Sequence, residues 1–296
     1  MNDINTLKLL FIINPGSGNN NTDWHAVIRK HFETLNHTIE LFDLSDTPVP
    51  EKIKQKIAEY NPNRVVAVGG DGTVKLVAQC LMQTNIPLGI LPAGSANGLA
   101  KDLGIPEEAD KAMDILLTDS TKKIHVIKIN DELCIHLSDI GFNAYVIKKF
   151  EQEKKRGMWS YVKATWKVLW NKPQMFVEIK INNAIEKRNA AMVVIANATR
   201  YGSGAVINPR GKLNDDVFEV VIVKKISGSE IFKMLVTHQP YNAQKTELLQ
   251  TTSLQMKSAG RVHFQVDGEY LGKVNNIKAD ILTNALEIMV PEETNK

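Results

Sequence analysis

The N-terminal part of the chain alternates between short apolar runs and amphipathic stretches. The apolar runs fit buried parallel strands, and the stretches between them carry apolar residues at helical spacing. Strands that alternate with helices in this way predict a parallel sheet with right-handed crossovers. We expect strands at residues 7–13, 38–44, 65–68 and 86–91, and helices at residues 23–35, 51–60 and 74–82.

The pattern changes beyond a polar seam at residues 118–123. Many short alternating segments with turn residues between them predict an antiparallel sandwich. We therefore expect an α/β domain at residues 1–121 and a β domain at residues 122–296, whose final strand is able to return to the first domain. The expected strands of the second domain are residues 123–129, 133–138, 175–181, 192–196, 217–223, 261–266, 276–281 and 286–290.

One helix is expected among these strands, at residues 158–170. Trp159, Val162, Trp166 and Trp170 share a face of it, and several lysines and an arginine lie nearby in the sequence. A stripe of this kind is more often part of a core. Basic residues beside tryptophans also suit an interface with anionic lipid, and both interpretations stay open.

Polar loops that contain glycine follow three of the N-terminal strands. Because the carboxyl ends of parallel strands meet at one edge of a sheet, we expect these loops to lie together. Backbone N–H groups of such turns, at the start of a helix, are suited to bind phosphate. The loops are residues 14–18 (Asn-Pro-Gly-Ser-Gly), 69–73 (Gly-Gly-Asp-Gly-Thr) and 92–97 (Pro-Ala-Gly-Ser-Ala-Asn).

Asp71 carries a negative charge that does not suit a phosphate site by itself. A carboxylate at this place fits a metal ion or the proton of a hydroxyl group. Alternatively, Asp71 and Thr73 cap the helix that follows, and Ser95 or Asn97 caps the helix after the third loop.

Composition limits the class of protein. Hydrophobic residues make up 43% of the chain and charged residues 23%, as in ordinary globular proteins. The net charge of +3 gives no reason to expect nucleic acid as a partner. The two cysteines, Cys80 and Cys134, form no metal-binding or redox pair, and no apolar run approaches the roughly 18 residues of a membrane span. We expect a cytoplasmic protein.

The three loops, in this order, resemble the diacylglycerol kinase and sphingosine kinase superfamily. This resemblance implies a Rossmann-like α/β nucleotide-binding domain, of the kind found in NAD kinase and phosphofructokinase, followed by a lipid-binding β-sandwich. Residues 139–144 also resemble a family segment, whereas Lys75 and Leu76 stand where the family usually has asparagine and glutamate. By resemblance, the ATP-binding residues are Asn14, Pro15, Gly16, Ser17, Gly18, Gly69, Gly70, Asp71, Gly72, Thr73, Gly94, Ser95 and Asn97.

Two later segments complete the resemblance. Residues 266–269 (Val-Asp-Gly-Glu) read as a hairpin turn on their own, but the family implies that Glu269 is the general base, beside Asp71 as a second catalytic carboxylate. Residues 213–220 read as an Asx turn before a strand. There the family implies a Mg²⁺ site made by Asp215 with backbone carbonyls of Leu213 and Val217.

The expected function is an ATP- and Mg²⁺-dependent lipid kinase that acts on the hydroxyl of diacylglycerol, a sphingoid base or a related lipid. The expected partner is lipid at the inner face of a membrane, which the protein visits transiently; a homodimer is compatible with the sequence. One alternative is an NAD kinase. Another is a non-catalytic lipid-binding protein of the same fold, which the departure at Lys75 and Leu76 supports.

Overall fold

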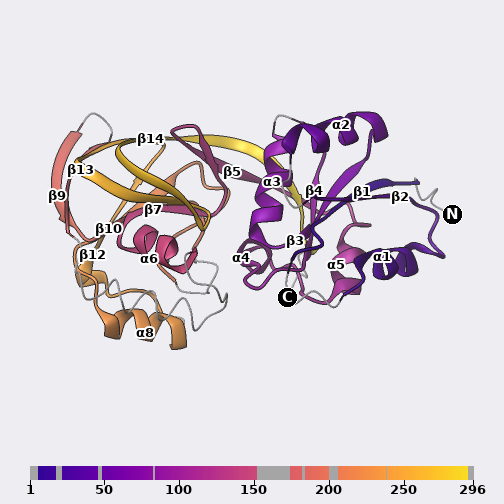
Figure 1. Ribbon diagram of the computed structural model, residues 1–296, viewed down its shortest axis with the longest axis horizontal. Coiled ribbons are helices and arrows are strands. Elements are labelled where there is room, and N and C mark those ends of the chain that lie inside the picture. Colours follow the sequence, from indigo (N-terminus) through magenta and orange to yellow (C-terminus); the bar gives the residue numbers. More distant parts are fainter. Residues whose placement is uncertain are drawn as a thin grey trace. The chain divides into compact units, whose positions relative to one another are not determined.

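The chain forms two compact units (Figure 1). Unit 1 comprises Met1–Ile124 and Asn284–Lys296, and unit 2 comprises His125–Thr283. The chain passes from unit 1 to unit 2 within strand β5 (Thr121–Ile129) and returns within strand β14 (Glu269–Met289). The computed structural model describes residues 6–17, 22–45, 49–82, 84–151, 174–181, 184–199, 206–237 and 239–292.

Unit 1 is built on a parallel sheet with the strand order β2–β1–β3–β4. The far end of β14 adds to this sheet beside β4, through the pair Ile288 and Leu88. All residues of β3 and β4 are buried, which accounts for their continuous apolar sequences, because both faces of a parallel sheet are covered. The strands are β1 (Lys8–Ile13), β2 (Thr38–Asp43), β3 (Arg64–Gly69) and β4 (Leu88–Pro92).

Helices cover both faces of this sheet. Helices α2 and α3 pack together on one face, and α1 and α5 lie on the other (Figure 1). Local sequence sets their ends: Asp23 accepts a hydrogen bond from the N–H of Ala26 at the start of α1, and Asn61 ends α2 in the left-handed conformation. The helices are α1 (Trp24–Phe32), α2 (Pro50–Tyr60), α3 (Asp71–Leu81), α4 (Gly98–Asp102) and α5 (Ala109–Ile115).

Unit 2 is an antiparallel β structure. Its main sheet has the order β12–β11–β10–β7–β13–β14; β8 pairs with β13 and β9, and β5 pairs with β14 and β6. Besides β5 and β14, its strands are β6 (Glu132–Cys134), β7 (Leu137–Gly141), β8 (Met175–Ile181), β9 (Ala184–Ala190), β10 (Met192–Ala196), β11 (Phe218–Val223), β12 (Thr246–Thr251) and β13 (Ser253–Val266).

The strands at the centre of unit 2 are buried on both faces. Val193 and Ile195 of β10 belong to the core between the strands, whereas Met192 and Val194 belong to a second core beneath the helices. This division follows from the alternation of side chains along a strand. Within the described ranges, the helices of unit 2 are α6 (Phe142–Glu151), α8 (Gly228–Thr237) and the 3₁₀ helix η1 (Ala243–Lys245).

The predicted fold class, an N-terminal α/β domain followed by an antiparallel β-sandwich, is confirmed. Two predicted strands, residues 276–281 and 286–290, are parts of the single strand β14, in which Asn284 has a φ of 50°. The expected helix at residues 158–170 lies outside the described residues. No helix in the described ranges is both long and apolar enough to cross a bilayer.

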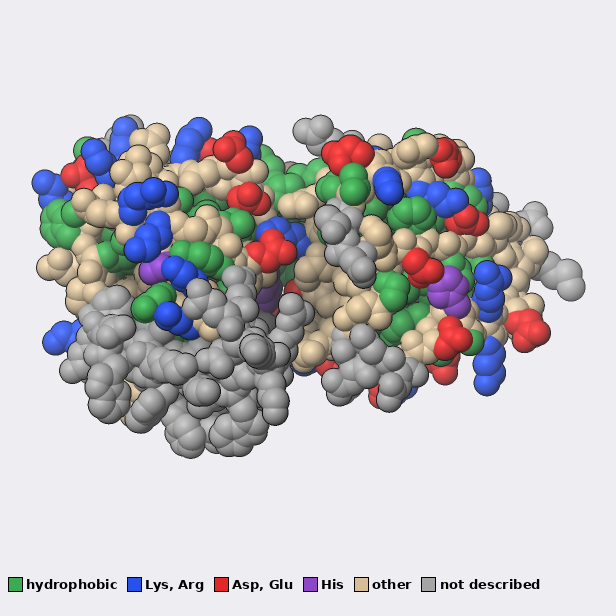
Figure 2. Space-filling model, viewed as in Figure 1, with side chains coloured by type: hydrophobic (Ala, Val, Ile, Leu, Met, Phe, Trp, Pro, Cys, Tyr) green, Lys and Arg blue, Asp and Glu red, His purple; other side chains and the backbone are tan. Residues whose placement is uncertain are grey.

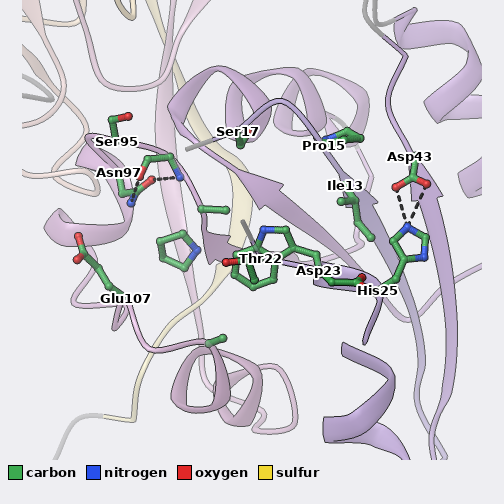
Figure 3. Close-up of a pocket in the computed structure, with 15 residues that line it drawn as sticks. Ile13, Pro15, Ser17, Thr22, Asp23, His25, Asp43, Ser95, Asn97 and Glu107 are labelled. Carbon is green, nitrogen blue, oxygen red and sulfur yellow. Dashed lines mark hydrogen bonds and ion pairs between the residues drawn. The ribbon is translucent and has the colours of Figure 1, made fainter. Parts of the chain in front are cut away.

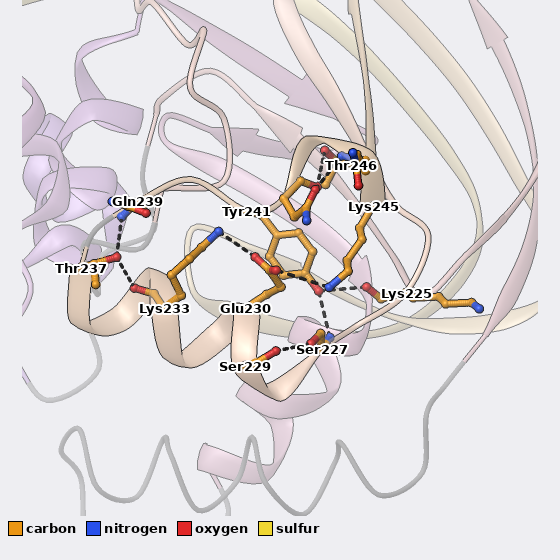
Figure 4. A network of polar contacts seen from close by, with 12 residues as sticks. Lys225, Ser227, Ser229, Glu230, Lys233, Thr237, Gln239, Tyr241, Lys245 and Thr246 are labelled. Atoms are coloured by element: carbon orange, nitrogen blue, oxygen red, sulfur yellow. Dashed lines mark hydrogen bonds and ion pairs between the residues drawn. The ribbon is translucent and has the colours of Figure 1, made fainter.

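A polar network fastens α8 to the loop before β12 (Figure 4). The hydroxyl of Tyr241 accepts a hydrogen bond from the N–H of Ser227 and donates one to the carbonyl of Lys225, both at 2.9 Å. Glu230 of α8 pairs with Lys233 at 2.8 Å and with Lys245 at 3.3 Å. Burial raises the pKa of Tyr241, which is 6% exposed, so its hydroxyl stays protonated and able to donate.

We expect Tyr241→Phe to lower the free energy of unfolding by about 1–2 kcal/mol, because it leaves one N–H and one carbonyl without their partner. The measurement is thermal and urea unfolding. Tyr60→Phe is the matched control, since the hydroxyl of Tyr60 is buried without a hydrogen-bond partner among the described residues. Equal losses of stability in the two variants would contradict this role of the Tyr241 hydroxyl.

Candidate functional site

The three glycine-bearing loops meet at the carboxyl edge of the unit 1 sheet, as the sequence predicts. The Asn14 side chain, after β1, donates through Nδ2 to Oγ1 of Thr73 in the first turn of α3, at 3.0 Å. The N–H of Ala93, after β4, donates to the carbonyl of Gly69 at 2.9 Å. These contacts join the first and third loops to the middle loop, so the loops form one polar surface.

Two glycines allow the middle and third loops to touch backbone to backbone. A Cβ added to Gly94 would lie 2.4 Å from the Cα of Gly70, closer than any real contact. Gly69 is restricted in a similar way, because a Cβ there would lie 2.3 Å from Oγ1 of Thr73. Gly72 has open space around it instead. The loops can therefore keep this arrangement only with glycine at positions 69 and 94, whereas a Cβ at position 70 would lie 3.2 Å from the Cα of Gly94 and would need only a small shift.

Asp71 binds the start of a neighbouring helix and does not cap its own. Its Oδ2 accepts the N–H of Gly98 at 3.0 Å, and its Oδ1 accepts the N–H of Leu99 at 3.2 Å. The N-cap of α3 is Gly70, and no side chain caps that helix. Each carboxylate oxygen of Asp71 thus accepts one hydrogen bond that holds α4 and the third loop in place. The remaining lone pairs of the carboxylate are available to a cation.

The third loop closes on itself through Asn97. Its Oδ1 accepts the N–H of Gly94 and its Nδ2 donates to the Gly94 carbonyl, both at 2.9 Å. Asn97 is 6% exposed and adopts the left-handed conformation, with a φ of 52°. The sequence indicates Asn97 as a candidate cap of the next helix, but its side chain does not cap α4. Its role in the structure is to shape the loop.

A pocket of about 730 Å³ lies beside these loops in unit 1 (Figure 3). Five predicted nucleotide-binding residues line it: Pro15, Ser17, Gly94, Ser95 and Asn97. Residues 69–73 do not line it and instead brace the loops from within. Gly18 lies outside the described residues.

The pocket also contains charged residues that the sequence analysis missed. Asp23, His25, Asp43 and Glu107 all line it. His25 Nε2 lies 2.8 Å from Oδ1 of Asp43 (Figure 3). Asp43 is the last residue of β2, whose carboxyl end lies at the same edge as that of β1, so the strand-end rule could have found it. His25 and Glu107 lie on a helix and a loop, where no comparable signal marks them.

The other predicted catalytic residue, Glu269, belongs to unit 2. It is exposed and opens β14, directly after the turn of the β13–β14 hairpin. Asp267 and Gly268 form this turn with φ values of 50° and 87°, as expected for an Asp-Gly hairpin. The hairpin therefore places Glu269 at the end of a rigid two-stranded element.

A carboxylate anchors this turn to β7. Asp267 accepts the N–H groups of Ile135, His136 and Leu137 at 3.1, 2.9 and 3.1 Å. Its own N–H donates to the carbonyl of Leu137 at 2.9 Å. Hydrogen bonds from these three N–H groups to an ionised carboxylate are stronger than the same bonds to a neutral acceptor would be. Asp267 thus supports Glu269 without being placed to react itself.

A buried hydrogen-bonded network lies behind the same hairpin. Asp139, fully buried, accepts Nδ2 of Asn143 at 2.7 Å and Nε2 of Gln265 at 2.6 Å. Gln265 in turn accepts the N–H of Gly268 at 2.7 Å. Residues 139–144, which resemble a family segment, therefore help to fix the position of the general-base candidate.

The predicted Mg²⁺ ligands, Leu213, Asp215 and Val217, all lie in the segment that directly precedes β11. Asp215 Oδ1 is buried and has no hydrogen-bond partner among the described residues, which suits a cation. Asp216 adopts the left-handed conformation with a φ of 59°, and the Leu213 carbonyl already accepts the N–H of His125 at 2.8 Å. Burial raises the pKa of nearby Glu219, and the Asp215 charge adds to this shift.

The described residues contain no group of three or more His, Cys, Asp or Glu side chains that could hold a metal ion. A Mg²⁺ ion at Asp215 would therefore depend mainly on backbone carbonyls and water. The donor set fits a hard cation in chemistry, with one carboxylate and carbonyl oxygens of Leu213 and Val217 in the same loop.

Comparison with protein families matches the chain over most of its length. Residues 8–129 match the diacylglycerol kinase catalytic domain, and residues 138–290 match the YegS C-terminal NAD kinase beta sandwich-like domain. The chain belongs to the family of proteins in which these two domains follow one another. The resemblance found in the sequence is thereby confirmed.

Curated relatives support the same assignment. The chain is 28% identical over 250 residues to a protein named "Probable lipid kinase YegS-like" of Chromohalobacter salexigens, which covers 81% of this chain and 80% of the relative. It is also 28% identical over 249 residues to the protein named "Probable lipid kinase YegS" of Escherichia coli, which covers 81% of this chain and 82% of the relative.

Solved structures share the fold. A diacylglycerol kinase from Bacillus anthracis aligns with a TM-score of 0.72 at 18% identity, over 97% of this chain and 98% of the other. An NAD kinase from Archaeoglobus fulgidus in complex with ATP aligns with a TM-score of 0.59 at 13% identity, over 97% of this chain and 95% of the other. At these identities, the similarity shows the fold alone.

We expect Gly94→Ala to weaken nucleotide binding at least tenfold and to lower stability, because the new Cβ would push the third loop away from Gly70. Isothermal calorimetry with ATP and thermal unfolding provide the two measurements. Gly72→Ala is the control for stability, since its Cβ meets open space and alanine favours a helix by about 1 kcal/mol. A Gly94→Ala variant with unchanged stability and ATP affinity would show that the two loops need no such contact.

Proposed function

We propose that this protein is an ATP-dependent lipid kinase, which transfers the γ-phosphoryl group of ATP to a hydroxyl of diacylglycerol, a sphingoid base or a related lipid. The observation that carries the proposal is the convergence of three glycine-bearing loops beside a pocket of about 730 Å³ in unit 1. Family membership and the names of the relatives support the choice of a lipid as the acceptor.

In this proposal, unit 1 holds the nucleotide. Backbone N–H groups of the loops after β1 and β4, which line the pocket, bind the phosphates, because glycine lets the backbone approach them closely, and the turn after β3 braces these two loops. Mg²⁺, when bound with ATP, neutralises charge that develops on the phosphates during transfer. Asp71 keeps the third loop in place and has lone pairs left for that ion. The carboxylates of Asp43 and Glu107 line the pocket and would repel phosphate, so the uncharged parts of the nucleotide face them.

Unit 2 provides the base in this proposal. The Glu269 carboxylate accepts the proton of the lipid hydroxyl as the hydroxyl oxygen forms its bond to the γ-phosphorus and the bond from that phosphorus to the β–γ bridging oxygen breaks. ADP leaves, and the proton remains on Glu269 until water removes it. The fixed hairpin supports this role, because a base must be held within hydrogen-bond reach of the proton that it removes.

The proposal also assigns a structural Mg²⁺ to Asp215 with the carbonyls of Leu213 and Val217. The buried Oδ1 of Asp215, which lacks a hydrogen-bond partner among the described residues, supports this assignment. An ion at this place would also offset the repulsion between the carboxylates of Asp215 and Glu219.

The test is ADP release from ATP over a panel of lipids in neutral detergent micelles. We expect turnover that requires both Mg²⁺ and one lipid class with a free hydroxyl, with the phosphate recovered on that lipid. Turnover with NAD in place of lipid would instead identify an NAD kinase. Lipid binding without ADP release, with any lipid of the panel, would identify a non-catalytic lipid-binding protein.

Glu269→Gln should lower turnover by about 100- to 10,000-fold, the usual contribution of a general base, because the amide keeps the shape but not the basicity. ATP affinity should stay the same, since the nucleotide loops belong to unit 1. Turnover and ATP affinity are measured for each variant. Glu132→Gln in β6 is the matched control and should keep full turnover.

If Glu269→Gln keeps its turnover, Glu269 is not the general base. If turnover and ATP affinity fall together, the variant is defective in nucleotide binding and the loss of turnover says nothing for a base. Asp267→Asn helps to separate position from chemistry. It loses charge on a carboxylate held by three N–H groups, so we expect lower stability together with lower turnover.

A further inference from the structure

Unit 2 presents a group of aromatic and basic side chains at the junction of α6 with the β13–β14 hairpin. Figure 2 shows blue Lys and Arg side chains around a purple His side chain on this face of the unit. The group is called the aromatic–basic patch below. Its members are Tyr145, Lys148 and Lys149 of α6, Arg261 and His263 of β13, and Tyr270 and Lys273 of β14.

Three rings form the centre of the patch. Tyr145 stacks on His263 with ring centroids 4.5 Å apart and ring planes 11° apart. Nδ1 of His263 lies 2.7 Å from the hydroxyl of Tyr270, whose ring centroid is 5.6 Å away. These contacts join α6 to both strands of the hairpin, so the patch is a built surface with fixed rings.

Cations surround the rings. Nζ of Lys148 lies 5.5 Å from the ring centroid of Tyr270, and Nζ of Lys149 lies 5.6 Å from that of Tyr145. Arg261 donates through Nη2 to the carbonyl of Lys273 at 2.7 Å. Within the described ranges, none of these lysines has a carboxylate at ion-pair distance, in contrast to Lys187, Lys233 and Lys245 of the same unit.

Burial and the neighbouring lysines act on His263 in the same direction. The pKa of His263 is lowered to about 4, first by burial and then by Lys273, Lys148 and Lys149. His263 is therefore neutral at physiological pH, and its ring can remain stacked among the lysines. A surface with this much uncompensated positive potential attracts anions.

We propose that the aromatic–basic patch docks unit 2 on the surface of an anionic lipid bilayer. Tyrosine rings suit the interface between headgroups and acyl chains, and unpaired lysines suit anionic headgroups. A soluble anion would use the charges but would not need the ring cluster.

The patch adjoins the proposed catalytic base in the sequence of the hairpin. Glu269 directly precedes Tyr270, and Asp267 anchors the turn that both residues follow. Docking through Tyr270 therefore holds the hairpin that carries Glu269 at the surface of the bilayer. This inference deepens the proposed function and rests on it only for the identity of the reacting group.

The test is co-sedimentation of the full chain with vesicles of equal parts phosphatidylcholine and phosphatidylglycerol, and with vesicles of phosphatidylcholine alone. The test variant is Lys149→Gln with Lys273→Gln. The matched control is Lys128→Gln with Lys257→Gln, which removes the same charge from exposed positions of unit 2 outside the patch. Lysines near an anionic surface contribute about fivefold each, so we expect roughly 25-fold weaker binding for the test variant.

The wild-type chain should bind the anionic vesicles, should bind them more weakly as salt rises, and should not bind phosphatidylcholine alone. The control should bind within about twofold of wild type, because its charges lie outside the contact. Equal losses for both variants, or binding unaffected by the patch substitutions, would overturn the proposal. The proposal would also be overturned if the test variant lost binding of a single-stranded oligonucleotide but still bound anionic vesicles like the wild-type chain.

A second assay separates this inference from the proposed function. Turnover of a lipid in neutral detergent micelles should be the same for wild type and the test variant, whereas turnover of that lipid in anionic vesicles should fall with binding. If the wild-type chain turns over no lipid in either micelles or vesicles, the proposed kinase activity is refuted. The co-sedimentation result then decides by itself whether the patch is a docking surface. Equal turnover on vesicles would refute the docking surface and leave the kinase standing.

Discussion

The site in unit 1 depends on one steric constraint, the contact between the backbones of Gly70 and Gly94. Because no side chain separates them, the turn after β3 and the loop after β4 can lie against each other. This approach places the Asp71 carboxylate at the N–H groups of Gly98 and Leu99. The hydrogen bond from Asn14 to Thr73 then adds the loop after β1. The contact between the turn after β3 and the loop after β4 therefore depends on glycine at position 94.

In unit 2, as in unit 1, an aspartate carboxylate joins two chain segments by binding backbone N–H groups. Asp267 binds three backbone N–H groups of a neighbouring segment, as Asp71 binds two. From the sequence, Asp71 is interpreted as a metal-binding or catalytic carboxylate and Asp267 as part of a hairpin turn. In the structure, both join chain segments that are distant in sequence. Glu269, two residues after Asp267, is exposed.

The sequence predicted the fold class and the convergence of the loops, because burial of parallel strands and glycine turns are local signals. It did not predict β9, an edge strand whose side chains are mostly exposed and whose middle three residues are charged, so that no apolar alternation marks it. It also missed the pairing of Asp71 with α4, and the pocket residues His25 and Glu107. These depend on which loops the sheet order brings together, and single-sequence patterns carry no such information.

Strand β14 is shared by both units, and this has a consequence for biosynthesis. Ile288 completes the sheet of unit 1 beside Leu88, and the N–H of Val290 donates to the carbonyl of Ser120. While the ribosome is still making unit 2, β4 is therefore an uncovered edge with unpaired N–H and carbonyl groups, a template for intermolecular association. Unit 1 can finish folding only after unit 2 has been synthesised, so contacts of very long sequence separation form last. A folding chain of this design would gain from a chaperone that shields β4 during translation.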